Sequence, residues 1–213
     1  MEDGLELSPE EWRKQSLERA VSLGYPPAIP LPIIDDFMEP RPAPRIIERF
    51  LALIGVVAVA FGLDRQKART WLEREGAWSA LTDEERTFIV EGSDDSNYFQ
   101  IRTEALWALA WVLGLVDDLD FSHYCRDKFD AFVPNIWKDE DSARMRPLVR
   151  LRSFDEIATA CDLACCLHWA LRQAWRDGTE SPGKLRAYVI WQRRRALEWV
   201  LSRHAWDDVP MDT

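Results

Sequence analysis

The stretch CDLACCLHWALRQAW, residues 161–175, places three cysteines and one histidine within eight residues. Such a cluster suits a metal site, a redox site or the interior of a helix. A capping box at Ser153 and Glu156 precedes the stretch and Gly178 follows it, so one helix is predicted over about 153–177. The chemistry of the cluster then depends on the helix face that each side chain occupies.

Helical spacing places the thiols and the imidazole on two faces. Cys165 lies on the flank of His168, while Asp162 and Cys166 fall on the opposite side of the helix. We interpret the thiols as core of a helical bundle, with the imidazole turned away from water. His168 stands at the centre of the predicted buried row, which consists of Ile157, Cys161, Ala164, His168, Leu171 and Trp175.

A zinc site is the main alternative for this cluster. Cys161, Cys165 and His168 are spaced so that they stack on one helix face. Structural zinc, however, usually takes four ligands from more than one element, and the sequence offers no second Cys/His cluster. A thiol on an apolar stripe is also expected to be protonated and inert. We therefore expect no metal, no cofactor and no catalytic cysteine.

The rest of the 213-residue chain reads as helical too. We predict an all-α fold, a single irregular bundle of about seven helices with an extended Pro-rich N-terminal arm. Residues 1–43 are expected to form a helix and this arm, packed on an all-α domain over 44–213. The predicted anchors of the arm are Ile29, Leu31, Ile33, Ile34 and Phe37. The helices are expected over about 8–24, 44–61, 64–75, 82–92, 98–113, 153–177 and 182–202.

Composition and charge restrict the classes of function. The N-terminus lacks a signal-peptide pattern and the cysteines do not form a disulfide framework, so we expect a cytoplasmic protein. The apolar segment 50–63 is too short to span a bilayer and is predicted to be a buried core helix. The net charge is −10, with the acids concentrated in the middle of the chain, which argues against nucleic-acid binding.

One polar cluster is predicted between three helices. Glu104 and Gln192 fall within the apolar arcs of their own helices, as His168 does, and Arg172 lies on the flank of His168. A meeting of these four side chains would satisfy the hydrogen-bonding needs of each. Two interpretations stay open: a structural network that fixes helix register, and a polar pocket with a pKa-shifted Glu or His.

Four segments of the chain carry a recognisable pattern: RTEALWALAWVLGL, LRSFDEIATACDLACCLHWALRQA, GKLRAYVIWQRRRALEWV and the closing WDDV. They resemble a bacterial family known only as a domain of unknown function, DUF4272, over roughly residues 40–210. The resemblance implies an all-α fold and no established activity. The family usually shows Glu-Arg where this chain has Gln192-Arg193, which argues against catalysis through that position.

Two functional hypotheses follow. The first is a cytosolic protein-binding module of the immunity, antitoxin-like or adaptor type, which the resemblance to proteins that accompany secreted toxins suggests. Its partner would be a basic toxin or effector that meets the acidic residues 115–141. The alternative is a small-ligand binder or enzyme that uses the Glu104, His168, Arg172 and Gln192 cluster. The chain shows no common catalytic motif, so we favour binding over catalysis.

Overall fold

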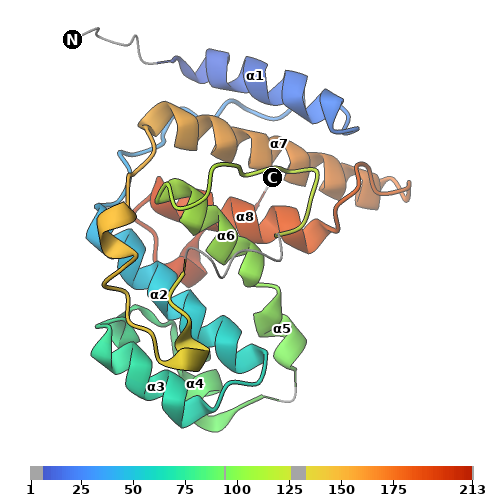
Figure 1. The fold of residues 1–213 in the computed structure, drawn as a ribbon. Helices are drawn as coiled ribbons and strands as arrows, with labels where there is room; N and C mark the ends of the chain where they lie inside the picture. The colour runs from blue at the N-terminus through green and yellow to red at the C-terminus, as the bar shows by residue number, and fades with distance from the viewer. Residues whose placement is uncertain (1–6, 94, 126–132, 213) are drawn as a thin grey trace, which may run out of the picture. The chain divides into compact units, whose positions relative to one another are not determined.

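The computed structural model describes residues 7–93, 95–125 and 133–212 (Figure 1). Its contacts group the described residues into two compact units. Unit 1 comprises 1–40, 120–124 and 152–213, and unit 2 comprises 41–119 and 125–151. The N-terminal segment is thus grouped with the two C-terminal helices. The predicted division into 1–43 and 44–213 differs, since it separates these parts of the chain.

The predicted all-α fold is confirmed. In the described part of the chain there are α-helices, short 3-10 turns and no strand. Each of the seven predicted helices has a counterpart, and the one predicted over 98–113 is divided in two. The helices are α1 (Pro9–Ser22), α2 (Ala43–Ala60), α3 (Arg65–Arg74), α4 (Asp83–Glu91), α5 (Ser96–Gln100), α6 (Thr103–Val112), α7 (Phe154–Arg176) and α8 (Ala187–Val200).

Two helix boundaries differ from the prediction. The chain leaves the helix at Ile101 and Arg102, and the Arg102 guanidinium is buried there against Glu85. The last helix begins at Ala187 instead of residue 182, because Gly183 has a φ of +74°. A Cβ at Gly183 would lie 2.2 Å from the Tyr25 ring, so this turn depends on both the conformation and the small size of glycine.

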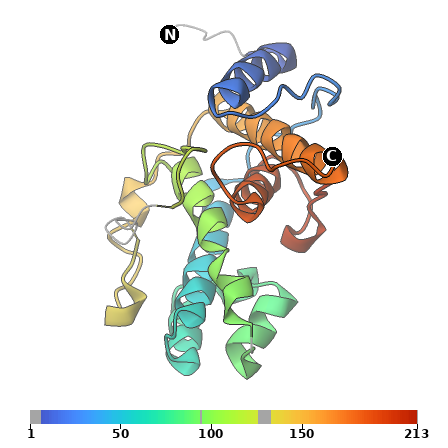
Figure 2. The same ribbon diagram turned by 90° about the vertical axis from the view of Figure 1, so that its right-hand side faces the viewer.

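α7 is covered on two sides in unit 1, by α1 and by α8 (Figure 1). Asp162 and Cys166, on the side of α7 opposite His168, are therefore buried as well, at 2% and 1% exposure. α1 covers this side (Figure 2), and its Arg13 guanidinium reaches Asp162 at 2.8 Å. Trp175 differs from the prediction, since it was placed in the buried row and is 81% exposed at the end of α7.

The Pro-rich arm is held by fewer apolar side chains than predicted. Phe37 packs on Trp12, with ring centroids 6.0 Å apart. Ile29 is 74% exposed and Ile33 is 40% exposed, so neither is an anchor. Polar bonds take their place: Arg13 donates to the carbonyls of residues 31 and 32, at 2.6 and 3.0 Å.

Unit 2 is built around α2. Every residue from Arg49 to Val56 is buried, which confirms the predicted core helix, and no helix in the described ranges is long and apolar enough to cross a membrane. The Arg49 guanidinium makes two 2.6 Å bonds to Glu85, and Arg102 also bonds that carboxylate. Burial would raise the pKa of Glu85, but the two guanidinium groups hold it below its ordinary value.

We expect Asp162→Leu to lower the free energy of unfolding by about 3–5 kcal/mol, because it leaves the buried Arg13 charge without its carboxylate. Chemical denaturation measures this change. The double variant Arg13→Met, Asp162→Leu should recover part of the loss. As a control, Glu73→Ala removes the partner of Arg69 in an exposed pair and should cost less than about 1 kcal/mol. Equal losses of stability in Asp162→Leu and Glu73→Ala would contradict the view that Asp162 balances a buried charge.

Candidate functional site

α8 carries three consecutive arginines, and two of them are buried. Arg193 is 0% exposed and Arg194 is 4% exposed. Arginine is rarely buried without partners, so each buried guanidinium needs hydrogen-bond acceptors from the residues around it. Arg193 donates to the carbonyl oxygens of Asp120 and His123, at 2.7 and 2.8 Å, which ties the segment 120–124 to α8.

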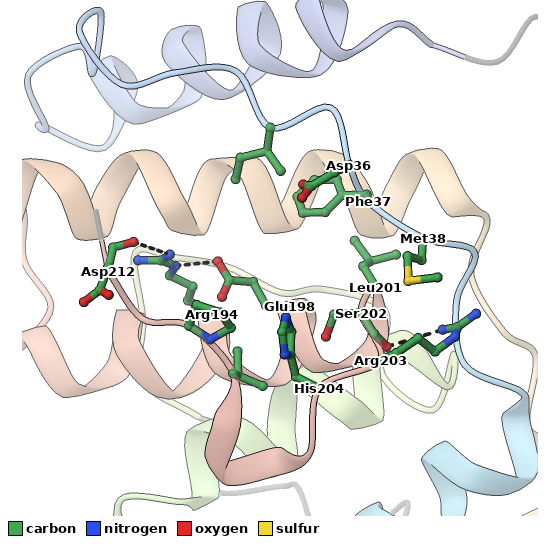
Figure 3. A pocket seen from close by; sticks show the side chains of 13 residues that line it. Asp36, Phe37, Met38, Arg194, Glu198, Leu201, Ser202, Arg203, His204 and Asp212 are labelled. Carbon is green, nitrogen blue, oxygen red and sulfur yellow. Dashed lines mark hydrogen bonds and ion pairs between the residues drawn. The ribbon is translucent and has the colours of Figure 1, made fainter.

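Arg194 is the centre of the site. Its Nε donates to Glu198 Oε1 at 2.8 Å, and its Nη2 donates to the carbonyl oxygen of Asp212 at 3.1 Å (Figure 3). Its Nη1 contacts His168 Nδ1 at 2.5 Å. One side chain therefore joins α7, α8 and the C-terminal segment.

The contact with Arg194 sets the tautomer of His168. A guanidinium has donors only, so the Nδ1 atom of His168 must be the acceptor. The proton of the neutral imidazole then resides on Nε2. This is the nitrogen with which His168 can donate a hydrogen bond to another group.

His168 is held neutral. Burial is the first cause that lowers its pKa, to about 4, and the positive charges of Arg194 and Arg172 lower it further in the same direction. The ring is 8% exposed. At neutral pH the imidazole is therefore uncharged, with the cations of Arg194 and Arg172 beside it.

A first pocket, the His168 pocket, opens beside this ring and has a volume of about 330 Å³. Arg172, one of its lining residues, has no hydrogen bond or ion pair with any described residue. The lining comes from α7, the following loop and the first residue of α8: His168, Leu171, Arg172, Trp175, Thr179, Ser181 and Ala187.

A second pocket, the tail pocket, lies between the arm, the end of α8 and the C-terminal segment (Figure 3). Its volume is about 490 Å³. Arg194 and Glu198 line it, so the same guanidinium that lines the tail pocket bonds the imidazole that lines the His168 pocket. The other lining residues are Ile34, Asp36, Phe37, Met38, Leu201, Ser202, Arg203, His204, Val209, Pro210 and Asp212.

Two of the α7 thiols adjoin Glu198. The Cys165 Sγ donates to Glu198 Oε1 at 3.2 Å, and Cys161 lies beside Cys165. Both thiols are buried, and burial raises the pKa of Cys161 well above its ordinary value. Cys166 faces Asp162 instead, where burial raises its pKa to about 12. The described cysteines are free thiols.

The structure places the four predicted site residues as follows. His168 and Arg172 line one pocket. Gln192 is buried on α8, at 3% exposure. Glu104 belongs to unit 2, where its carboxylate accepts a hydrogen bond from the backbone N–H of Cys125 at 3.0 Å. A meeting of Glu104 with the other three stays a prediction.

Sequence reasoning missed Arg194 and Glu198. The two are four residues apart on α8, which is the spacing of a helical ion pair, and this was the available signal. A run of three arginines usually marks a solvated face, and the run hid the buried position of Arg194. Besides Glu198, α7 and the C-terminal segment supply partners that make this burial favourable.

We expect the folded protein to lose stability as the pH falls from about 6.5 to about 4. In this window the unfolded chain protonates His168 and the folded chain does not, because the pKa of His168 is lowered to about 4. The full contribution is of the order of 3 kcal/mol. Denaturation at several pH values should show that His168→Gln flattens the profile relative to wild type. The control His204→Gln changes an exposed ring and should leave the pH profile of stability as in wild type. Coincident profiles for wild type and His168→Gln would contradict the lowered pKa of His168.

Comparison with known proteins gives one match. No curated protein and no solved structure matches the chain. The model of the family described as domain of unknown function (DUF4272) matches residues 13–209, which includes most of α1 and the arm as well as the segments that resemble the family. The chain therefore belongs to the DUF4272 family.

Proposed function

We propose that unit 1 binds a small organic anion in the His168 pocket. The observation that carries this proposal is the pairing in one pocket of a neutral imidazole with Arg172, a guanidinium that has no partner among the described residues. A guanidinium without a carboxylate beside it favours a carboxylate or phosphate from outside.

The electrostatics of the pocket support an anionic ligand. Arg194 and Arg172 both act on His168 with positive charge, and the ring adds no charge of its own. Glu198, the carboxylate that bonds Arg194, lines the other pocket. A ligand in the His168 pocket would therefore meet positive charge and an Nε2–H donor.

The remaining lining supports a planar or apolar group on the ligand. Trp175 is 81% exposed, which is unusual for so large an apolar ring, and Leu171 lies one turn before it on α7. Indole rings stack on planar groups and cover apolar ones. The proposed ligand class is thus an aromatic or otherwise planar carboxylate or phosphate.

The site supports binding better than acid–base catalysis. General acid–base groups work best with a pKa near the working pH. The pKa of His168 is lowered to about 4, so at neutral pH its ring is a weak base. We therefore assign His168 a role in holding the ligand by a hydrogen bond.

We expect wild type to bind members of a panel of aromatic carboxylates and mononucleotides in calorimetric titrations. Arg172→Ala should weaken that binding about 10- to 100-fold, since a charged hydrogen bond is lost. Trp175→Ala should weaken it as well. Arg176→Ala is the matched control, because Arg176 is an exposed arginine on the same helix and does not line the pocket.

Two results would contradict this function. One is an absence of binding across the panel by folded wild-type protein. The other is equal binding by Arg172→Ala and wild type, which would place the ligand elsewhere.

A second candidate is recognition of a basic protein partner of the toxin or effector class through unit 2. The observation that favours it is Trp137, which is 50% exposed beside the exposed acids Asp139 and Asp141. Exposed tryptophans are frequent energetic centres of interfaces. The segment 126–132 of the predicted acidic surface lies outside the described residues.

Free thiols among the described cysteines support the bacterial cytosol as the compartment for either function.

We expect Trp137→Ala to abolish capture of such a partner from the native bacterium, while Trp175→Ala leaves capture intact. The two variants remove exposed tryptophans from different units, so each controls for the other. The proteins retained by wild type and by each variant are compared by mass spectrometry. Capture of the same proteins by wild type and Trp137→Ala would count against this candidate.

A further inference from the structure

We infer that Cys161, Cys165 and Glu198 form a binding site for a thiophilic divalent cation, with zinc as the first candidate. One sulfur of each cysteine and one oxygen of the glutamate all lie within 4.8 Å of one another. The two cysteines come from one face of α7 and the glutamate from α8, so the donors belong to two packed helices. This inference is independent of the anion pocket.

The separations suit a tetrahedral ion. Zinc lies about 2.3 Å from sulfur and about 2.0 Å from a carboxylate oxygen, which places two sulfur ligands about 3.8 Å apart. A sulfur and an oxygen ligand of the same ion would lie about 3.5 Å apart. No pair in the cluster therefore needs to close by more than about 1.3 Å to reach this geometry.

The carboxylate keeps one oxygen for an ion. Arg194 and the Cys165 thiol both donate to Oε1 of Glu198, at 2.8 and 3.2 Å. Oε2 has no hydrogen-bond partner in the described part of the chain. Zinc sites accept thiolate and carboxylate ligands together, and a site with three protein ligands keeps its fourth position for water or another donor.

The charges of the bound state balance. Two thiolates and one carboxylate carry three negative charges, and a divalent cation with Arg194 carries three positive charges. A buried site of zero net charge avoids the large cost of an uncompensated ion. In the metal-free protein the Cys165 thiol donates to Glu198, and Glu198 pairs with Arg194, so the same balance holds. Binding therefore releases two protons for each ion.

The tail pocket gives an ion access to the cluster. Glu198 lines this pocket, and Figure 3 shows its side chain beside Arg194 at the pocket wall. Cys161 and Cys165 are 0% and 1% exposed, so an ion would reach them past Glu198. The open fourth position would then face the tail pocket, where a water molecule or a small ligand completes the coordination.

The test is a titration of the reduced, full-length protein with Co²⁺ and Cd²⁺ under anaerobic conditions. We expect one ion per chain, sulfur-to-metal charge-transfer absorption and release of two protons per ion. Cys161→Ala and Cys165→Ala should lose the charge-transfer band, and Glu198→Gln should weaken binding at least about 10-fold. Zn²⁺ should raise the melting temperature of wild type and leave that of Cys161→Ala unchanged.

The chain supplies a matched control for these variants. Cys166→Ala removes a buried thiol from the same helix, but Cys166 faces Asp162 and not Glu198, so its titration should equal that of wild type. Circular dichroism without metal establishes that each variant is folded. The inference is overturned if wild type shows no charge-transfer band at stoichiometric Co²⁺, or if Cys161→Ala and Cys165→Ala both bind as wild type does.

Discussion

Arg194 is a buried cation, and unit 1 has to supply the hydrogen-bond partners that water would otherwise provide. Its guanidinium is 5% exposed, and it is bonded to a carboxylate of α8, an imidazole of α7 and a carbonyl of the C-terminal segment. Losing any one partner leaves a buried donor unpaired, which costs more than an ordinary hydrogen bond contributes. The register of α7 on α8 and the course of the last residues are therefore set together. Each partner of the Arg194–His168 contact lines a pocket, Arg194 the tail pocket and His168 the His168 pocket.

Buried arginines recur as ties between helices. Arg13 joins α1, the arm and Asp162 of α7, while Arg49 and Arg102 share the carboxylate of Glu85 in unit 2. Helices of 9 to 23 residues offer limited apolar area, and their packing leaves freedom in register. A guanidinium with five fixed donors removes that freedom, because its acceptors must occupy defined positions.

The sequence predicts local structure here better than it predicts partners. Capping boxes gave the starts of α1, α4 and α7, and the side chains bond as the motif requires. The helical period also placed His168 on a buried face. The period does not reveal that a second helix, α1, covers the opposite face of α7 and buries Asp162 there. Arg194 was missed for the same reason, since its burial depends on acceptors that are distant along the chain.

The arrangement around Arg194 also links the two sides of unit 1 electrostatically. A cation held by Oε2 of Glu198 would share that carboxylate with Arg194, which also bonds His168 and the carbonyl of Asp212. An anion at Arg172 would act on the same imidazole, since both arginines lower its pKa. Any coupling of this kind is reciprocal, because a change in affinity at one site implies an equal change at the other. Arg194 is thus a structural tie that lines one pocket and bonds the imidazole that lines the other.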